Sequence, residues 1–241
     1  MIGFLLGSLL AVSAEPVKIA FAPSLRDWAE YEDQLTYTTK EGEKIEIVRR
    51  RRVEAKQKDS RGYIGLEAKI EVLSEKWDGE LLPEPDPPMV ELRMDSVRAD
   101  GTLAFFSPDP EDPGLLFRFR RLEAIGLGNG DRSVGDRWTV PAPGDEDLDI
   151  AAAEWTVKLE RLQRIKTDPL TRLTLGYSEP DSKLRATGWV ELMAGGGWSE
   201  RGELTVKEIP LPSSDEPPMT LVWKWIAKRA VVAGTDPGES F

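Results

Sequence analysis

The stretch Tyr-Ile-Gly-Leu-Glu-Ala-Lys-Ile-Glu-Val-Leu, residues 63–73, decides the fold class. Its apolar side chains recur at alternate positions from Ile64 to Val72, and charged side chains fill the positions between them from Glu67 to Glu71. Successive side chains of a β-strand point to opposite faces, so this pattern predicts a long strand with one buried face and one solvated face. It therefore favours a mainly β protein.

Further strands are predicted on either side of this one, from alternating apolar residues and from turns rich in glycine, proline and acidic residues. Those of the first half span residues 35–39, 45–53, 90–94, 103–106 and 115–120. Those of the second half span residues 155–165, 173–177, 184–194, 198–209 and 219–231. Leu162 and Ile165 fall on opposite parities, which predicts a β-bulge near Arg161. Short connections favour pairing of consecutive strands, so we expect an antiparallel meander.

The stretch Asp131–Pro141 separates the two series of strands. Residues 128–131 tolerate positive φ, Val134–Asp136 predicts a second turn, and residues 137–140 alternate as a short strand. One helical turn is expected at residues 151–153. A large antiparallel sheet must bury its apolar face by curling or by packing on a second sheet. The predicted fold is mainly β, a large curved antiparallel meander sheet, half-barrel or sandwich-like, with little helix.

The motif Val-Gly-Asp-x-Trp at residues 134–138 precedes strands and a glycine-punctuated hairpin from Gly188 to Leu204. In these features the segment Asp131–Val206 resembles uncharacterised exported bacterial β-sheet proteins. The resemblance implies an envelope location and a large curved antiparallel sheet. It brings no catalytic residues to this chain.

The N-terminal segment, residues 1–14, carries no charged side chain, and its apolar run ends in small residues before Glu15. This pattern is typical of a cleavable secretory signal peptide, and the run is shorter than the roughly 20 apolar residues that span a bilayer. We therefore expect a secreted or periplasmic bacterial protein. Residues 15–233 are predicted to form a single β domain, with a two-part sheet divided near 128–144 as one arrangement, and residues 234–241 a polar tail.

The chain has 32 basic and 43 acidic residues, a formal charge of -11, and neither histidine nor cysteine. Without those two residue types it lacks disulfides, the usual zinc sites, and Ser-His-Asp or Cys-His catalytic groups. The negative charge disfavours general nucleic-acid binding. Paired carboxylates within about 5–9.5 Å in an aromatic cleft remain one route to glycoside hydrolysis. We expect no enzymatic activity, no cofactor, no metal, no nucleic-acid partner and no transmembrane helix.

The densest positive run of this acidic chain consists of Arg49, Arg50, Arg51 and Arg52. On a strand, alternation splits the run into two pairs that face opposite sides of the sheet. Such pairs are candidates for binding phosphate or carboxylate through bidentate contacts. The alternative is ordinary ion pairing within the sheet, with acids such as Glu54, Glu67 or Glu71.

Two of the predicted strands carry apolar residues on both faces. Trp189 projects from the face opposite to Val190, and Ile226 from the face opposite to Trp225. Strands of this kind are covered on both sides. Either a helix or loop packs over the concave side, or the sheet encloses an apolar cavity. In the second case the candidate ligand-binding residues are Trp155, Trp189, Trp198, Trp223 and Trp225.

Three functions follow from these features. The leading hypothesis is an exported, non-enzymatic binding protein with a role at the bacterial envelope. One alternative is a periplasmic carrier of a lipid or another hydrophobic ligand, and the other is envelope assembly or scaffolding through an edge strand. An internal cavity would favour the carrier, and a filled core with an exposed apolar patch would favour assembly.

Overall fold

The computed structural model describes most of the chain. The described residues are 16–83, 88–106, 113–165, 168–180, 182–193, 197–210 and 218–231. The predicted signal peptide and the predicted polar tail lie outside them. No described helix is long and apolar enough to cross a membrane.

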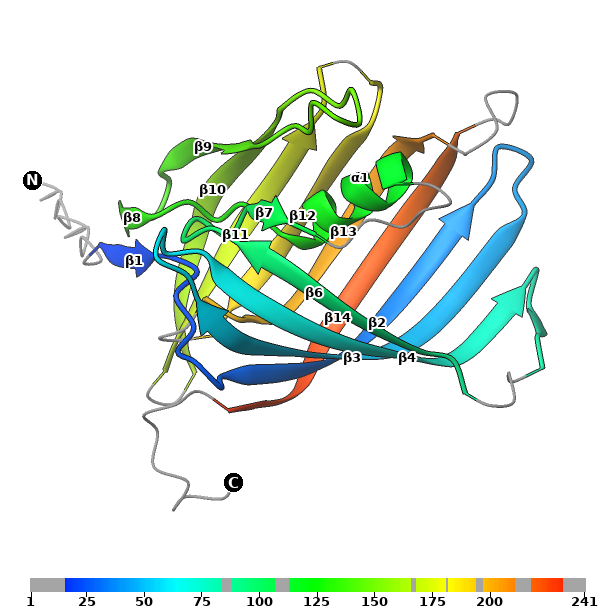
Figure 1. Ribbon diagram of the computed structural model, residues 1–241, viewed down its shortest axis with the longest axis horizontal. Coiled ribbons are helices and arrows are strands. Elements are labelled where there is room, and N and C mark those ends of the chain that lie inside the picture. Colours follow the sequence, from blue (N-terminus) through cyan, green and yellow to red (C-terminus); the bar gives the residue numbers. More distant parts are fainter. Residues whose placement is uncertain are drawn as a thin grey trace, which may run out of the picture.

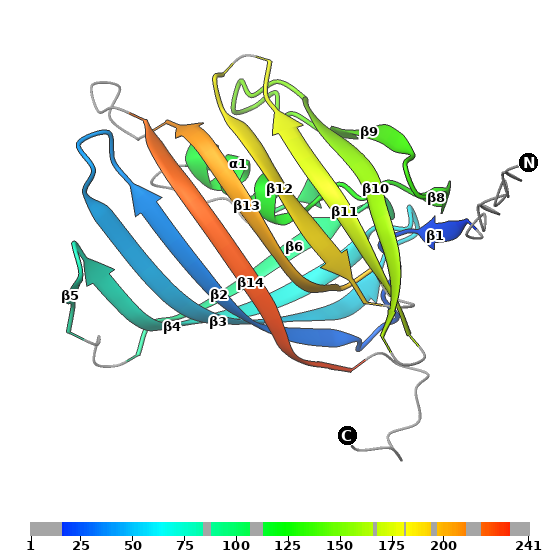
Figure 2. The ribbon, with the colours of Figure 1, turned by 180° about the vertical axis from the view of Figure 1, so that it is seen from behind.

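One antiparallel sheet of twelve strands dominates the structure (Figures 1 and 2). Its first half contains β2 (Trp28–Thr38), β3 (Lys44–Lys58), β4 (Ile64–Trp77), β5 (Glu80–Leu81), β6 (Val90–Val97) and β7 (Leu103–Phe105). Its second half contains β9 (Arg137–Ala142), β10 (Ala153–Ile165), β11 (Asp168–Ser178), β12 (Arg185–Leu192), β13 (Ser199–Ile209) and β14 (Met219–Val231). A separate two-stranded ladder pairs β1 (Val17–Ile19) with β8 (Gly130–Arg132). The predicted fold class is confirmed.

The order of strands across the sheet is β7-β6-β4-β3-β2-β14-β13-β12-β11-β10-β9, with β5 paired to β4. The first half therefore grows outward from β2, and the second half grows inward from β9 to β14. Between them the chain crosses from one edge of the sheet to the other. The halves join where β14 pairs with β2, for example through Trp223 opposite Leu35.

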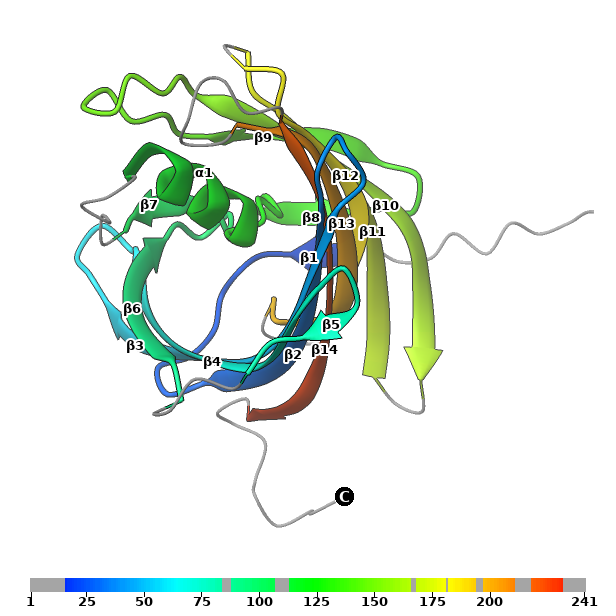
Figure 3. The ribbon, with the colours of Figure 1, turned by 90° about the vertical axis from the view of Figure 1, so that its right-hand side faces the viewer.

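The crossing segment contains helix α1 (Pro113–Glu123), which lies on the concave side of the curved sheet (Figure 3). The strand predicted at residues 115–120 is therefore wrong. Pro113 suits the first turn of a helix, where its missing N–H has no partner to lose, and Arg120 and Arg121 in the last turn complement the helix dipole. The helical period also brings Phe117 and Arg121, four residues apart, onto one buried face.

The turns of the crossing segment need glycine. Gly128, Gly130 and Gly135 have positive φ, and a Cβ on Gly128 would lie 2.7 Å from Trp138 Nε1. That indole nitrogen donates a hydrogen bond to the Leu127 carbonyl oxygen, 2.9 Å away. Trp138 thereby fixes the start of β9 against the crossing segment.

Pairing registers test the finer predictions. The β10–β11 register shifts between Leu159 and Arg161, which confirms the predicted bulge. The helical turn predicted at residues 151–153 is wrong, because Ala153 begins β10 and the turn lies earlier, closed by the Asp145–Ile150 bridge. On β4, the alternate residues Ile64, Ala68 and Ile70 are buried, as predicted.

Candidate functional site

The two faces of strand β6 are reversed from what its sequence suggests: its charged side chains point inward and its apolar side chains point outward. Its register with β4 places Glu91 opposite Ile70 and Arg93 opposite Ala68, and both of these β4 residues face the core. Because side chains on one face of a sheet lie opposite one another, Glu91 and Arg93 point inward. Leu92 consequently points outward and is 70% exposed. The predicted alternation is present, but the apolar set faces solvent.

The inward-facing charges of β6 join others beneath α1. Two acids and one arginine come from β2 and the helix, and two acids and three arginines come from β3 and β6. This interior charge cluster consists of Asp33, Arg49, Arg51, Glu91, Arg93, Asp95, Arg120 and Glu123. With four acids and four arginines, its formal charges balance.

Asp33 and Glu123 are the two hubs of the cluster. Asp33, fully buried on β2, accepts hydrogen bonds from Arg49 Nε at 2.9 Å and from Arg51 Nε at 2.8 Å. Glu123, at the end of α1, accepts from Arg49 Nη2 at 2.8 Å and from Arg93 Nη2. Arg49 therefore links the sheet to the helix.

The α1 side of the cluster also reaches the edge of the sheet. Arg120 Nη2 lies 2.7 Å from Glu91 Oε1, and Glu91 is half exposed while Arg120 is almost fully buried. Removing one partner from a buried pair leaves an uncompensated charge, which costs about 3–5 kcal/mol. The cluster thus binds α1 to the first half of the sheet.

Burial and charge shift two pKa values in opposite directions. Burial alone would raise the pKa of Glu123, but Arg93, Arg49 and Arg51 lower it to about 2. For Asp95, burial outweighs the nearby Arg93 and raises the pKa to about 6. Asp95 is thus the weakly compensated acid of the cluster.

Several buried polar atoms of the cluster have no hydrogen-bond partner within the described chain. They are Arg93 Nε, Arg120 Nε and Asp95 Oδ1. Buried donors and acceptors are normally paired, and an unpaired one costs about 1–3 kcal/mol.

The clefts between α1 and the centre of the sheet are small, and a larger one of about 310 Å³ lies between α1, β7 and residues 143–148. The largest of the small clefts has a volume of about 180 Å³ and runs between the helix and strands β2, β13 and β14, with Tyr37, Phe119 and Trp223 among its walls. Two others of about 100 and 60 Å³ flank Arg51. Pockets that hold small-molecule ligands usually measure about 300–1,000 Å³. The concave face is therefore largely filled by side chains.

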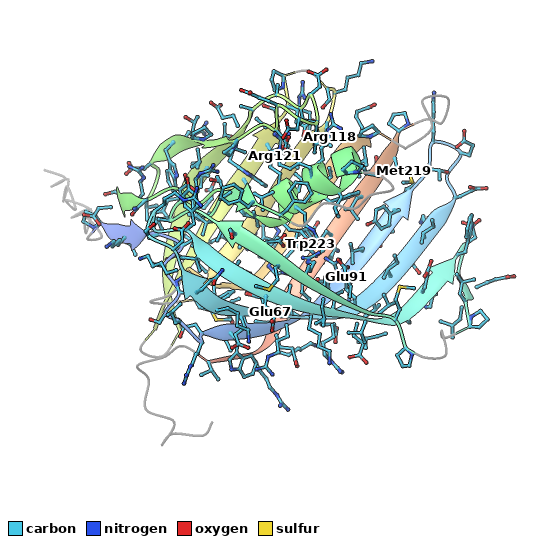
Figure 4. All side chains as sticks on the ribbon, viewed as in Figure 1. Glu67, Glu91, Arg118, Arg121, Met219 and Trp223 are labelled. Atoms are coloured by element: carbon cyan, nitrogen blue, oxygen red, sulfur yellow. The ribbon has the colours of Figure 1, made fainter. Side chains whose placement is uncertain are left out.

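A second set of ion pairs holds α1 to the other half of the sheet. Both arginines of this set, Arg118 and Arg121, come from α1 (Figure 4). Arg118 Nε lies 3.0 Å from Glu179 Oε2, and the fully buried Arg121 pairs with Glu179 Oε1. Tyr177 and Ser182 donate further hydrogen bonds to the same carboxylate. Burial opposes ionisation of Glu179, but these partners lower its pKa. Ion pairs therefore fix α1 to both halves of the curved sheet.

Four of the five candidate tryptophans lie in the core. The exposed fractions of Trp155, Trp198, Trp223 and Trp225 are 0–4%. Trp189 lies elsewhere: it pairs with Thr174 and Glu203 on the outer face, where the Arg172 guanidinium stacks 4.0 Å from its ring centre. The prediction of one concave face lined by all five is wrong for Trp189. Ligand binding by the other four stays a prediction.

The arginine run splits into two pairs, as strand alternation predicts. Arg49 and Arg51 enter the interior charge cluster, and they sit opposite Asp33 and Tyr31 in the β2–β3 register. The outer pair consists of Arg50, which bonds Glu71 at 3.2 Å, and Arg52, which stacks on the Trp28 ring at 4.2 Å. All four guanidinium groups have partners within the chain, and anion binding by them stays a prediction.

One polar group on the outer face was missed by sequence reasoning. Glu191 is fully buried under three arginines, with Arg172 Nη1 at 3.0 Å, Arg161 Nη2 at 3.4 Å and Arg201 Nε also bonded to it. Burial opposes ionisation of Glu191, but the arginines lower its pKa. Only the cross-strand register brings these residues together, so no local motif marks the group.

Sequence reasoning also missed the acids of the interior cluster. Asp33 does carry a signal, because it lies at the same parity as Tyr31 and Leu35, both buried on β2. Glu123 carries none while its segment is taken for a strand. Among the described residues, no three acidic side chains converge in a way that could hold a metal ion.

The outward-facing side chains of β6 belong to an outer apolar stripe. Its members are Leu81 on β5, Val90, Leu92 and Met94 on β6, and Phe105 on β7, each 44–70% exposed. β7 pairs only with Ser96 and Val97. No strand of the described chain therefore pairs with the far edge of residues 90–93.

Comparison with known proteins identifies no family for this chain. No family model matches the chain, and no curated protein does. Among solved structures, the chain is similar to a protein from Bacteroides fragilis described as exported and as having a YmcC-like fold. Identity is 10%, the TM-score is 0.29, and the match covers 89% of this chain and 100% of that chain. The family resemblance drawn from residues 134–138 stays a prediction.

Proposed function

We propose that this protein is an exported, non-enzymatic assembly protein that associates with another polypeptide through strand β6. The observation that carries the proposal is the inverted strand: three charged residues of β6 face inward, while Val90, Leu92 and Met94 face solvent. Exposed contiguous apolar residues beside an unpaired strand edge are typical of surfaces that another chain covers.

Strand addition is the mode of binding that this edge favours. An extended segment that pairs with residues 90–93 would satisfy their edge backbone groups, and its side chains on the outer face would cover Leu92. Leu92 and Val90 would then leave water. Burial of apolar surface contributes about 25 cal/mol per Å², so covering these side chains favours association.

The carrier alternative has less support. The clefts between α1 and the centre of the sheet are smaller than ordinary ligand pockets, and the largest measures about 180 Å³. The cleft of about 310 Å³ beside Phe117 is lined by none of the candidate tryptophans. Trp155 and Trp225 are packed rather than open to a cavity. A filled concave face with an exposed apolar stripe is the combination that favours assembly.

An enzymatic role also has less support. The acids that lie close together on the concave side are tied to arginines, as Asp33 is to Arg49 and Arg51. A general acid needs a carboxyl with a raised pKa that reaches a substrate. Asp95 has the raised pKa, but it lines a cleft of only about 60 Å³.

Site-specific photocrosslinking in the producing cell tests the proposal. A photoreactive residue at position 92 should yield one covalent protein adduct of discrete mass. The same residue at Thr187, exposed on the outer face of β12, is the matched control and should yield none. Val90→Lys in the same chain should abolish the adduct at position 92. Absence of an adduct at position 92, or equal adducts at both positions, would overturn the proposal.

A further inference from the structure

We propose that three arginines on the outer face of the second half of the sheet form a binding site for a phosphate group. They are Arg161 on β10, Arg172 on β11 and Arg201 on β13, and all three pair with Glu191 on β12. These four strands lie side by side in the sheet (Figure 2). We call the four side chains the outer arginine cluster. The cluster lies on other strands than the β6 edge and does not depend on the proposed function.

The pairing registers place the outer arginine cluster in one row across the sheet. Arg161 lies opposite Arg172. Glu191 lies between Arg172 and Arg201. Opposed side chains on one face of a sheet lie close together, and like charges in that position are destabilising. The opposed arginines therefore favour the approach of an anion.

One carboxylate does not balance three guanidinium groups. Glu191 Oε1 accepts hydrogen bonds from Arg172 Nη1 at 3.0 Å and from Arg161 Nη2 at 3.4 Å, and Oε2 accepts one from Arg201 Nε. Three positive charges and one negative charge give the cluster a formal charge of +2. Glu191 and, to a smaller extent, Glu200 raise the pKa of Arg201. The excess positive charge therefore lies on the side of Arg161 and Arg172.

The nearest acid along the chain does not offset this excess. Glu160 precedes Arg161 but pairs with Lys158 at 2.9 Å and accepts a hydrogen bond from Thr174. Among the side chains that the structure describes, Glu191 is the one carboxylate within ion-pair distance of the three arginines. The cluster thus keeps its positive charge in a chain whose formal charge is -11.

The guanidinium groups are held in place and still reach solvent. The side chains of Arg161, Arg172 and Arg201 are 52, 29 and 49% exposed. Arg172 is fixed a second time, because its guanidinium stacks 4.0 Å from the centre of the Trp189 ring. A guanidinium has five N–H donors, and each of these groups gives one hydrogen bond to Glu191. Donors therefore remain available to a ligand that approaches from solvent.

A phosphate group matches the cluster in charge and in geometry. It carries about -1.5 to -2 charges at pH 7 and three acceptor oxygens, and guanidinium groups bind it through two parallel hydrogen bonds. A bound dianion would neutralise the excess charge and relieve the repulsion between Arg161 and Arg172. Because Glu191 already orders both guanidinium groups, binding loses less side-chain entropy. A carboxylate ligand would supply only one negative charge.

Calorimetric titration with inorganic phosphate, at constant ionic strength, tests the site. Saturable binding is expected at pH 7.5. Arg161→Gln should weaken it about ten- to a hundredfold, the range for a hydrogen bond to a charged group. Arg137→Gln removes an exposed arginine from the same face of β9, outside the cluster, and should leave the affinity unchanged. Equal losses in the two variants would overturn the site.

A charge-conserving variant separates a bidentate site from general attraction. Arg172→Lys keeps the positive charge but loses the planar fork of donors and the stack on Trp189, so it should also weaken phosphate binding. Unchanged affinity in Arg172→Lys would show that charge alone attracts phosphate, and the proposed site would be wrong.

The charge of the ligand can be varied through pH. Phosphate gains a proton below its second pKa of about 6, so its affinity should fall between pH 7.5 and pH 5. Burial opposes ionisation of Glu191, but its arginines lower its pKa, so it stays charged at both values. Sulfate, which keeps both charges, should bind equally at the two pH values. A parallel fall for sulfate would contradict the preference for a dianion.

A second titration separates a lipid headgroup from a soluble phosphate. Vesicles of phosphatidic acid in phosphatidylcholine present the same monoester on a surface. Tighter binding to these vesicles than to inorganic phosphate, lost in Arg161→Gln, would assign a lipid headgroup. Binding of inorganic phosphate without a gain from the vesicles would assign a soluble phosphate. No saturable binding in either titration would overturn the proposal.

The outer arginine cluster and the β6 edge can be tested separately. Leu92→Lys should leave phosphate binding intact, and Arg161→Gln should leave the photocrosslink at position 92 intact. Far-UV circular dichroism of Arg161→Gln should match that of the parent, because this side chain is half exposed. A folded Arg161→Gln variant with undiminished phosphate affinity would exclude Arg161 from the site and overturn it.

Discussion

The two halves of the sheet present opposite chemistry to the same concave space. In the second half, strands β10 to β14 line it with packed apolar side chains such as Trp155, Leu175 and Leu204, each at most 2% exposed. In the first half, β3 and β6 line it with Arg49, Arg93 and their partners in the interior charge cluster. Large packed side chains therefore dominate the second half, and the interior charge cluster adds to apolar packing in the first.

The difference shows what a curved sheet needs from its crossing segment. Helix α1 serves both halves at once: Phe117 and Leu122 add apolar surface to the core, while Arg120 and Glu123 complement the charges of β3 and β6. A charged concave strand is stable here because the helix supplies the opposite charges. The outer face of β6 is then left with the apolar residues that would otherwise have filled the core.

The largest effect is expected in the packed half. Trp155→Ala removes a fully buried ring that lies 4.9 Å from the Tyr177 ring and opposite Val140, so we expect a loss of about 3–5 kcal/mol in the free energy of unfolding. Urea unfolding measures it. Trp155→Phe, which keeps most of the volume, should lose much less; equal losses would show that packing is not the cause.

In the charged half, Glu123→Gln should cost about 3 kcal/mol at pH 7, because each unit of pKa shift is worth about 1.4 kcal/mol. The pKa of Glu123 is lowered to about 2, so its contribution is present above the unfolded pKa and is lost as pH falls toward 2. Urea unfolding at pH 7 and at acid pH should therefore show a gap between variant and parent that narrows on acidification. A gap that stays constant would contradict this.

The contribution of Asp95 to stability depends on pH in the opposite direction. Its folded pKa is raised to about 6, so the folded state binds a proton more tightly, and Asp95 destabilises the fold progressively as pH rises from about 4 through 6. Asp95→Asn should therefore raise the free energy of unfolding at pH 8 by up to about 3 kcal/mol and leave it unchanged near pH 4. The melting temperature, measured at both pH values, should follow the same pattern. A variant that is less stable at pH 8 would show that the carboxylate is compensated after all.

The smallest change in stability is expected on the outer face of the same strand. Leu92→Lys replaces a side chain that is 70% exposed, so the free energy of unfolding of the monomer should change by no more than about 0.5 kcal/mol. The adduct that a photoreactive residue at position 90 forms with the partner polypeptide should nevertheless disappear. Thr187→Lys, on the outer face of β12, should leave that adduct intact, and loss of the adduct in both variants would remove the special role of β6.

Alternation in the sequence predicts much of this fold and little of its charged interior. The hairpin of β2 and β3, the bulge at Arg161 and the split of the arginine run all follow from local pattern, because a strand's period is independent of what packs on it. Which face of β6 turns inward is decided by Ile70 and Ala68 across the register and by the charges of α1. The same dependence on distant partners hid Glu191 and misplaced Trp189.

Helix α1 escaped prediction for a related reason. Leu115, Phe117 and Phe119 alternate as a strand does, and the helical spacing of Phe117 with Arg121 is masked because an arginine occupies a buried position. That arginine is acceptable only because Glu179, on the far half of the sheet, receives it. The partner that makes the helix possible lies more than fifty residues away, beyond any window of local pattern.

The junction of β14 with β2 bears on how the chain folds. Every other neighbouring pair of long strands, within the described residues, is adjacent or nearly so in sequence, so each half can form hairpin by hairpin through local contacts. The Trp223–Leu35 ladder instead joins the last strand of the described residues to the first strand of the large sheet, and such non-local pairing is slow. During synthesis β2 emerges early, and the edge that pairs with β14 stays unpaired until β14 has been made. The rate at which β14 docks therefore sets how long the nascent chain stays exposed to wrong pairing.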